Sequence, residues 1–180
     1  MRKTIKYIGL DVHQKSISIA VADNERSSEA RYVGRIDNNM DQLDKILRKF
    51  ISQGAELRCV YEAGPCGYPL YRHLSGNGID CCVVATSKIP RKSGDRLKND
   101  RRDAIDLARL HRAGELTAVY VPDPEDEALR DLVRAREDNV LALRKVKQQL
   151  NAFLLRHDII YSGRTRWSKA HFAWLSEIRF

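Results

Sequence analysis

The apolar segment Tyr7-Ile-Gly-Leu-Asp11-Val12 and the alternating segment Ser16-Ile-Ser-Ile-Ala-Val21 are separated only by His13-Gln14-Lys15. Both patterns are typical of strands, so the three residues between them predict a tight connection. Arg31-Tyr-Val-Gly-Arg-Ile36 predicts a third strand after a polar turn. The chain is therefore expected to open with an antiparallel meander.

Helices and strands alternate after this meander. Leu43, Ile46, Leu47 and Phe50 share one face of a predicted helix that Gly54 ends. The elements expected next are a strand at Arg58–Glu62, a helix carrying Leu70, Tyr71 and Leu74, a strand at Cys81–Val84, a helix from about Asp100 and a short strand at Val119–Val121. This alternation favours parallel crossovers, and hence an α/β fold with a mixed sheet flanked by helices.

The remaining third of the chain is expected to be helical. Asp123-Pro124 is a strong helix start, because Asp caps the first turn and Pro suits its first position. Apolar residues then recur at spacings of three and four to about His157, although Arg136 and Lys147 interrupt the series. We therefore expect a domain at 1–122 and a helical extension at 123–180, as a hairpin or a dimer arm.

Composition indicates a soluble, cytoplasmic protein. The 180 residues carry a net charge of +8, and no stretch approaches the roughly 18 consecutive apolar residues that a membrane helix requires. The opening residues lack the apolar core of a signal peptide. The spacing of the four cysteines does not match a zinc ribbon, so we expect reduced, mostly buried thiols.

The positive charge is concentrated in one segment. Lys88 to Arg112 contains nine Lys or Arg against four Asp. Such a patch indicates a polyanionic partner, because binding phosphates releases counterions, although a charge run can also be a solvated surface. The residues expected to contact a nucleic-acid backbone are Lys88, Arg91, Lys92, Arg96, Lys98, Arg101 and Arg102.

Four carboxylates are expected to meet at one edge of the sheet. Asp11 and Glu62 each stand at the carboxyl end of a predicted strand, where α/β sheets bind ligands. Asp100 and Asp103 are three residues apart as a helix begins, so they share a helical face. Together they could hold two Mg²⁺ or Mn²⁺ ions about 4 Å apart for phosphodiester chemistry. Asp106 is an alternative to Asp103, because the helix start is uncertain by a few residues.

Two further residues have competing interpretations. His13 could be a metal ligand or a proton shuttle, but the pattern favours a solvent-exposed turn histidine. Trp167 lies among Arg164, Arg166 and Lys169, which is compatible with contact to RNA or DNA.

Four motifs in order resemble the IS110 family of insertion-sequence transposases. They are Tyr7-Ile-Gly-Leu-Asp-Val-His-Gln-Lys15, Tyr61-Glu-Ala-Gly-Pro65, Lys98-Asn-Asp-Arg-Arg-Asp-Ala104 and the tail from Leu154 to Leu175. The resemblance implies a ribonuclease H-like, RuvC-type domain whose Asp-Glu-Asp-Asp set matches Asp11, Glu62, Asp100 and Asp103. It also implies a coiled-coil arm used in assembly as a dimer or tetramer, a structured RNA partner, DNA as substrate, and a second domain beyond Phe180.

Other functions remain open at this point. A Holliday-junction resolvase would use the same chemistry on four-way junctions. A non-catalytic nucleic-acid-binding or assembly module would share the carboxylates without cutting DNA. A phosphotransferase of the actin and sugar-kinase type is disfavoured, because Val12, His13 and Gln14 stand where a glycine would be needed near phosphates.

Overall fold

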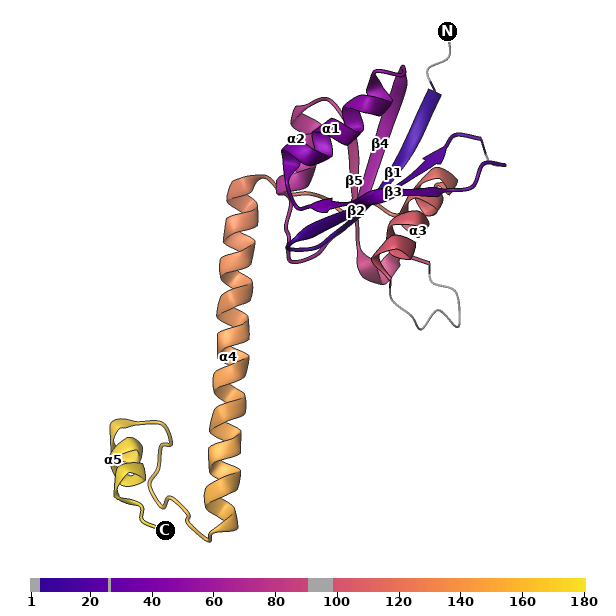
Figure 1. The fold of residues 1–180 in the computed structure, drawn as a ribbon. Helices are drawn as coiled ribbons and strands as arrows, with labels where there is room; N and C mark the ends of the chain where they lie inside the picture. Colours follow the sequence, from indigo (N-terminus) through magenta and orange to yellow (C-terminus); the bar gives the residue numbers. More distant parts are fainter. Residues whose placement is uncertain (1–3, 26, 91–98) are drawn as a thin grey trace. The chain divides into compact units, whose positions relative to one another are not determined.

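A computed structural model describes residues 4–25, 27–90 and 99–180. Its elements are β1 (Thr4–Val12), β2 (Ser16–Asp23), β3 (Arg31–Asp37), α1 (Met40–Ile51), β4 (Ala55–Glu62), α2 (Pro69–Gly76), β5 (Asp80–Val84), the 3-10 helix η1 (Thr86–Lys88), α3 (Asp100–Ala113), α4 (Pro124–Arg156) and α5 (Lys169–Glu177). The predicted mixed sheet flanked by helices, with a long helix after it, is confirmed (Figure 1).

The five strands form one sheet in the order β3-β2-β1-β4-β5. β2 pairs antiparallel with both β1 and β3, whereas β4 pairs parallel with β1 and β5. The predicted meander is therefore present, and the crossovers through α1 and α2 supply the parallel strands. The segment 119–121 was expected to be a short strand. In the structure only the preceding residue, Ala118, forms an isolated bridge, with Val84 of β5.

Two layers of helix cover the sheet (Figure 1). On one face, Leu43 and Leu47 of α1 and Leu70 and Leu74 of α2 pack in the main core cluster of apolar strand residues. On the other face α3 lies on β1 and β2, where alanines from both layers meet. Short side chains allow a helix to approach a sheet closely, and this approach determines where the N-terminus of α3 lies.

The cysteines are free thiols, as expected, but only Cys59 is fully buried. Cys66, Cys81 and Cys82 are half-buried. Burial raises the pKa of Cys81 to about 12, with smaller contributions from Cys82 and Asp80. The Cys81 thiol is therefore protonated and forms part of the packing.

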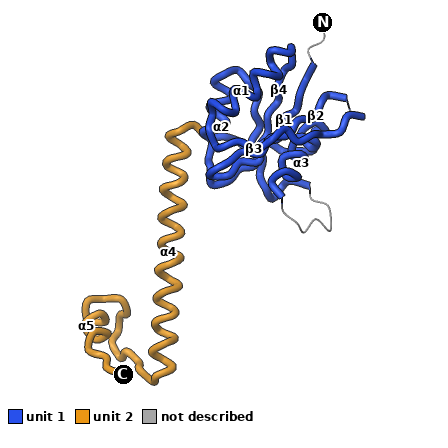
Figure 2. The backbone as a smooth tube through the Cα atoms, in the orientation of Figure 1, with its two compact units in different colours: residues 1–121 blue, residues 122–180 orange. Residues whose placement is uncertain are grey.

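The chain divides into two compact units, residues 1–121 and 122–180 (Figure 2). Unit 2 contains the 33-residue helix α4 and a small aromatic cluster around the buried His171. The ring of Trp167 packs against His171 and lies 5.1 Å from the Lys147 ammonium. Within the described ranges, no helix combines the length and apolarity needed to cross a membrane.

Candidate metal centre

Asp11 lies near the carboxyl end of β1 on the face that α3 covers. Tyr7 packs in the alanine cluster of that face, and strand side chains alternate, so Gly9 and Asp11 point the same way. The parallel register pairs Leu10 with Tyr61. Alternation along β4 puts Glu62, its last residue, on the same face, but among the described residues Glu62 does not belong to the group of close ligand atoms that contains Asp11.

Gly9 is the contact that brings α3 onto this face. A Cβ atom on Gly9 would lie 2.2 Å from the Ala104 carbonyl oxygen and 2.5 Å from the Ala108 nitrogen. Only a residue without a side chain allows this approach of helix to strand. α3 begins at the carboxyl end of β1, where Asn99 caps it by accepting a hydrogen bond from the Arg101 N–H at 3.0 Å. The first turn of α3 therefore carries Asp100 and Asp103 towards Asp11.

Burial and neighbouring charges both act on the pKa of Asp11. Its pKa is raised above the ordinary aspartate value, chiefly because burial penalises the charged form, and further by the negative charges of Asp100 and Asp103. His13 acts in the opposite direction on this pKa, through its charge and a hydrogen bond. Asp11 is only 9% exposed. A cation bound there would favour the ionised form of all three carboxylates.

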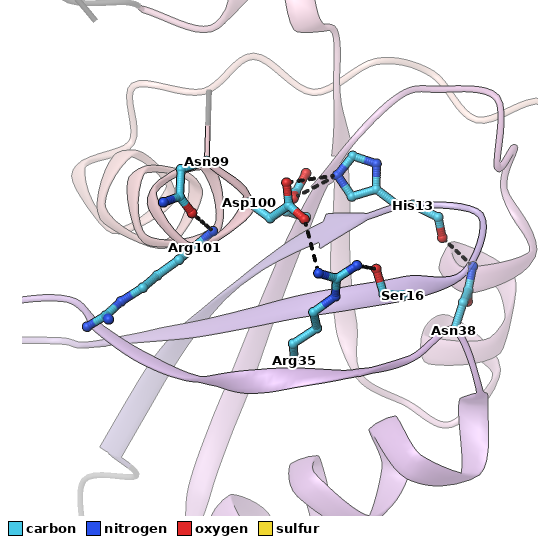
Figure 3. Close-up of polar contacts among 8 residues, drawn as sticks. His13, Ser16, Arg35, Asn38, Asn99, Asp100 and Arg101 are labelled. Atoms are coloured by element: carbon cyan, nitrogen blue, oxygen red, sulfur yellow. Dashed lines mark hydrogen bonds and ion pairs between the residues drawn. The ribbon is translucent and has the colours of Figure 1, made fainter. Parts of the chain in front are cut away.

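His13 stands in the β1–β2 turn and is partly exposed, as the sequence favoured, but its ring also faces the carboxylates. Its Nε2 lies 3.1 Å from Asp11 Oδ2 and 3.6 Å from Asp100 Oδ1, although the side chain is 42% exposed (Figure 3). Among the described residues, Asp11, His13 and Asp100 form a group whose ligand atoms all lie within 4.8 Å of one another. Oxygen and imidazole nitrogen are both metal-binding donors, so this set fits a divalent cation.

Arg35 is a residue of this cluster that the sequence analysis did not identify. It comes from β3, and its guanidinium donates to Ser16 Oγ at 2.9 Å and lies 3.8 Å from Asp100 Oδ2 (Figure 3). The register pairs Arg35 with Ser18, on the α3 face of the sheet. No spacing rule connects residue 35 with residue 100, because the contact depends on the β2–β3 pairing and on the position of α3. The side chain is 60% exposed and can also reach a phosphate.

The alternative fourth carboxylate, Asp106, is engaged elsewhere. It pairs with Arg109 on the same helix at 3.3 Å. Asp103 acts on the pKa of Asp11, and Asp106 is not among the causes of that shift. The charge of Asp103 therefore acts on Asp11, whereas Asp106 is paired with Arg109.

The predicted nucleic-acid-binding residues fall into two groups. Arg91, Lys92, Arg96 and Lys98 lie outside the described residues. Lys88, Arg101 and Arg102 are exposed, and the Arg101 guanidinium lies 5.3 Å from the centre of the Tyr32 ring. Lys88 follows β5, and Thr86 beside it reaches the Ala63 carbonyl at the end of β4. The positive charges of Lys88, Arg101 and Arg102 thus flank the sheet edge that carries Glu62 and the first turn of α3.

Comparisons with known proteins agree with one another. A family model for IS110-type DEDD proteins, described as a transposase, matches residues 8–158. The chain is 48% identical over 174 residues to a Sinorhizobium fredii protein that carries a transposase name, covering 97% of this chain and 45% of the relative. It is 41% identical over 176 residues to the transposase for insertion sequence element IS1533 of Leptospira borgpetersenii, covering 97% and 51% respectively.

The chain thus spans about half the length of these curated relatives. Among solved structures, Thermus thermophilus RuvC in complex with a Holliday junction substrate is similar with a TM-score of 0.40 and 11% identity. That similarity covers 64% of this chain and 99% of the RuvC chain.

Proposed function

Because the chain belongs to the IS110 family of transposases, we propose that it forms the metal-dependent nuclease part of a transposase that acts on DNA phosphodiesters. The observation that carries this proposal is the meeting of Asp11 and Asp100 with His13 at the carboxyl edge of a mixed sheet. The end of β1 with its turn supplies Asp11 and His13, and the start of α3, far later in the chain, supplies Asp100. Such convergence of ionisable side chains, with a perturbed pKa at its centre, is characteristic of functional sites.

Asp11, Glu62, Asp100 and Asp103 are the proposed metal ligands, and two Mg²⁺ or Mn²⁺ ions are the proposed cofactors. A divalent ion at this edge would activate the attacking oxygen and stabilise the leaving oxygen. The chain itself supplies the anionic pocket, because burial and neighbouring carboxylates make Asp11 costly to ionise without a cation. Gly9 and the Asn99 cap keep the first turn of α3 in position.

The proposed substrate is DNA, held by basic residues on both sides of the carboxylates. Lys88 flanks the ends of β4 and β5, whereas Arg101 and Arg102 stand in the first turn of α3. Contacts from Lys and Arg to phosphates position a strand without reading its sequence. The proposed set also includes Arg91, Lys92, Arg96 and Lys98, which continue the basic segment of the sequence. The same proposal includes a structured guide RNA as a partner, because the family resemblance implies one.

Self-association through α4 is a further part of the proposal. α4 exposes apolar side chains along its length, among them Leu129, Leu132, Val140, Leu143 and Val146. A helix with many exposed apolar residues gains stability by covering them, and a second copy of the helix is one way to do so. A dimer or tetramer would place more than one metal centre on the DNA.

Nicking of DNA tests the proposal. The chain is incubated with supercoiled plasmid and with a four-way junction, with Mg²⁺, with Mn²⁺ or with chelator. We expect metal-dependent cleavage that Asp100→Asn reduces by about 100-fold or more, the scale of loss when a group stabilising the transition state is removed. Asp106→Asn is the matched control, because its carboxylate lies on the same helix but pairs with Arg109.

The competing function is a nucleic-acid-binding or assembly module that does not cut. It is favoured by one fact, that the chain spans about half of its relatives. DNA binding by the chain without cleavage, whatever metal is added, would support this alternative. Cleavage of the junction alone would instead indicate a resolvase-like substrate preference.

A further inference from the structure

His13 is held in place by the backbone of its own hairpin. Its N–H donates to the Ser16 carbonyl at 2.8 Å, and its carbonyl accepts from Asn38 Nδ2 at 2.9 Å. These bonds connect the β1–β2 turn to itself and to the segment before α1. The imidazole is therefore directed at the carboxylates by the fold of the turn, as Figure 3 shows.

The imidazole faces two carboxylates from different elements. Its Nε2 lies 3.1 Å from Asp11 on β1 and 3.6 Å from Asp100 on α3. Two ligands bound side by side on one ion at about 2.1 Å are separated by about 3 Å. The His13–Asp11 separation is thus already at ligand spacing, the His13–Asp100 separation is close to it, and all three donors lie within 4.8 Å of one another.

The ion pair between His73 and Asp44 differs from the arrangement around His13. His73 Nε2 lies 2.8 Å from Asp44 Oδ1, and the other oxygen of that carboxylate pairs with Arg48 at 3.7 Å. Only one carboxylate faces His73, and the described residues form no cluster of three metal-binding groups there. His73 therefore provides an internal comparison for a histidine that only balances charge.

We propose that His13 is a nitrogen ligand of the cation held by Asp11 and Asp100, and that the site therefore takes Mn²⁺ in preference to Mg²⁺. The inference rests on the proposed metal-dependent function and names the metal class of that same site. Mg²⁺ strongly prefers oxygen ligands, whereas imidazole suits transition metals. An imidazole beside two carboxylates therefore shifts selectivity towards Mn²⁺. Arg35, the other cation near Asp100, cannot act as a ligand because it has no free lone pair.

The test combines pulsed electron paramagnetic resonance of bound Mn²⁺ with calorimetric titrations of Mn²⁺ and Mg²⁺. We expect the wild-type chain to show coupling of Mn²⁺ to a directly bound ¹⁴N. His13→Ala and His13→Gln should abolish that coupling and raise the Kd for Mn²⁺ about tenfold or more, the lower end of the losses seen when metal-site shells are altered. The Kd for Mg²⁺ should change much less. His73→Ala should leave the coupling and both Kd values unchanged.

The outcomes separate this inference from the function on which it rests. Saturable Mn²⁺ binding that Asp11→Asn abolishes, but with no ¹⁴N coupling in the wild type, would overturn the role of His13 and leave the carboxylate site intact. An equal loss of Mg²⁺ and Mn²⁺ affinity in both His13 variants would overturn the selectivity. Absence of metal binding with and without DNA would overturn both proposals. Circular dichroism melting establishes that each variant is folded.

Discussion

Asp11 combines burial with a concentration of negative charge that a soluble domain would ordinarily avoid. The residue is 9% exposed, and the negative charges of Asp100 and Asp103 act on it. Placing like charges together in a half-buried site costs stability unless a proton or a cation compensates. In the structure His13 and Arg35 provide part of that compensation. A tightly bound divalent ion would provide more.

We expect that no other residue can replace Gly9 without loss of stability. Gly9→Ala would place a Cβ atom 2.2 Å from a backbone oxygen of α3, which cannot rotate away as a side chain could. We expect a loss of about 1–3 kcal/mol in the free energy of unfolding, the usual scale for overpacking. A weaker metal affinity should accompany it, because α3 must shift and Asp100 with it. Urea denaturation and metal titration measure the two effects.

Gly76→Ala is the matched control for this substitution. Gly76 ends α2, and a Cβ atom added there would have no atom within 4 Å of it. Ala at such a helical position should leave stability unchanged or raise it by about 0.5–1 kcal/mol. Equal effects of the two substitutions would contradict the proposed close packing of α3 on β1.

Sequence reasoning reached some residues of the site and missed others for identifiable reasons. Asp11 and Asp100 stand at the end of a strand and the start of a helix, and such positions are visible in local patterns. The roles of His13 and Arg35 depend on contacts across 87 and 65 residues of chain, respectively, to Asp100. Local patterns do not report those contacts. A histidine two residues after a strand-end carboxylate, in a turn too short to move it away, was the available signal for His13.

Among the elements, α3 connects the candidate metal centre to the far end of the sheet. Its N-terminus carries the carboxylates, its middle packs on Gly9, and its C-terminus reaches the turn after β2. There the Arg112 guanidinium donates to the carbonyls of Asp23 and Glu25 at 3.2 and 3.1 Å. The helix is thus fixed at both ends, and this fixes the position of its first turn.

His111 makes the packing of this helix sensitive to pH. Its ring packs edge-on to Tyr7 at 5.4 Å, and among the described residues Nε2 has no hydrogen-bond partner. The pKa of His111 is lowered, first by burial and then by the charge of Arg58, with Asp80 acting in the opposite direction. The folded chain thus binds this proton less readily than the unfolded chain. The stability it contributes is present above the unfolded pKa of about 6.5 and is lost as pH falls towards the folded value.

We therefore expect His111→Phe to reduce the fall in unfolding free energy between pH 7.5 and pH 5. Phe preserves an aromatic contact with Tyr7 and cannot take up a proton. Urea denaturation of both proteins at the two pH values measures the change. A variant with the full pH dependence of the wild type would show that other groups control acid sensitivity.

The elements themselves were largely predictable from the sequence, whereas their packing was not. Alternation along β2 and helical spacing along α1 follow directly from which side chains face the core. A short strand was expected at Val119–Val121, because valine favours strands. The structure has only an isolated bridge at the neighbouring Ala118. In the structure these valines pack against the main core without a continuous partner strand. β propensity alone does not supply a pairing edge.

At the scale of the molecule, each of the two units has a distinct composition. Unit 1 holds the sheet, its main core and the candidate metal centre. Unit 2 has few buried apolar residues, Leu154 among them, and its long helix exposes many others. A unit with so small a core gains little stability from its own packing.

We expect residues 1–121 to fold alone and remain monomeric, and the whole chain to self-associate as its concentration rises. Sedimentation velocity over a range of concentrations measures both. Leu143→Asp on α4 should shift the whole chain towards monomer, because an exposed charge would have to be buried in the interface. A whole chain that stays monomeric at every concentration would contradict the proposed role of α4.

The most direct test of the central proposal is a calorimetric titration of Mn²⁺ and Mg²⁺ into the wild-type chain and into Asp11→Ala, with and without a DNA duplex. We predict saturable binding to the wild type and none to Asp11→Ala, with the fold retained by circular dichroism. Binding that survives Asp11→Ala unchanged, or that is absent from the wild type even with DNA, would contradict an acidic metal centre at this sheet edge.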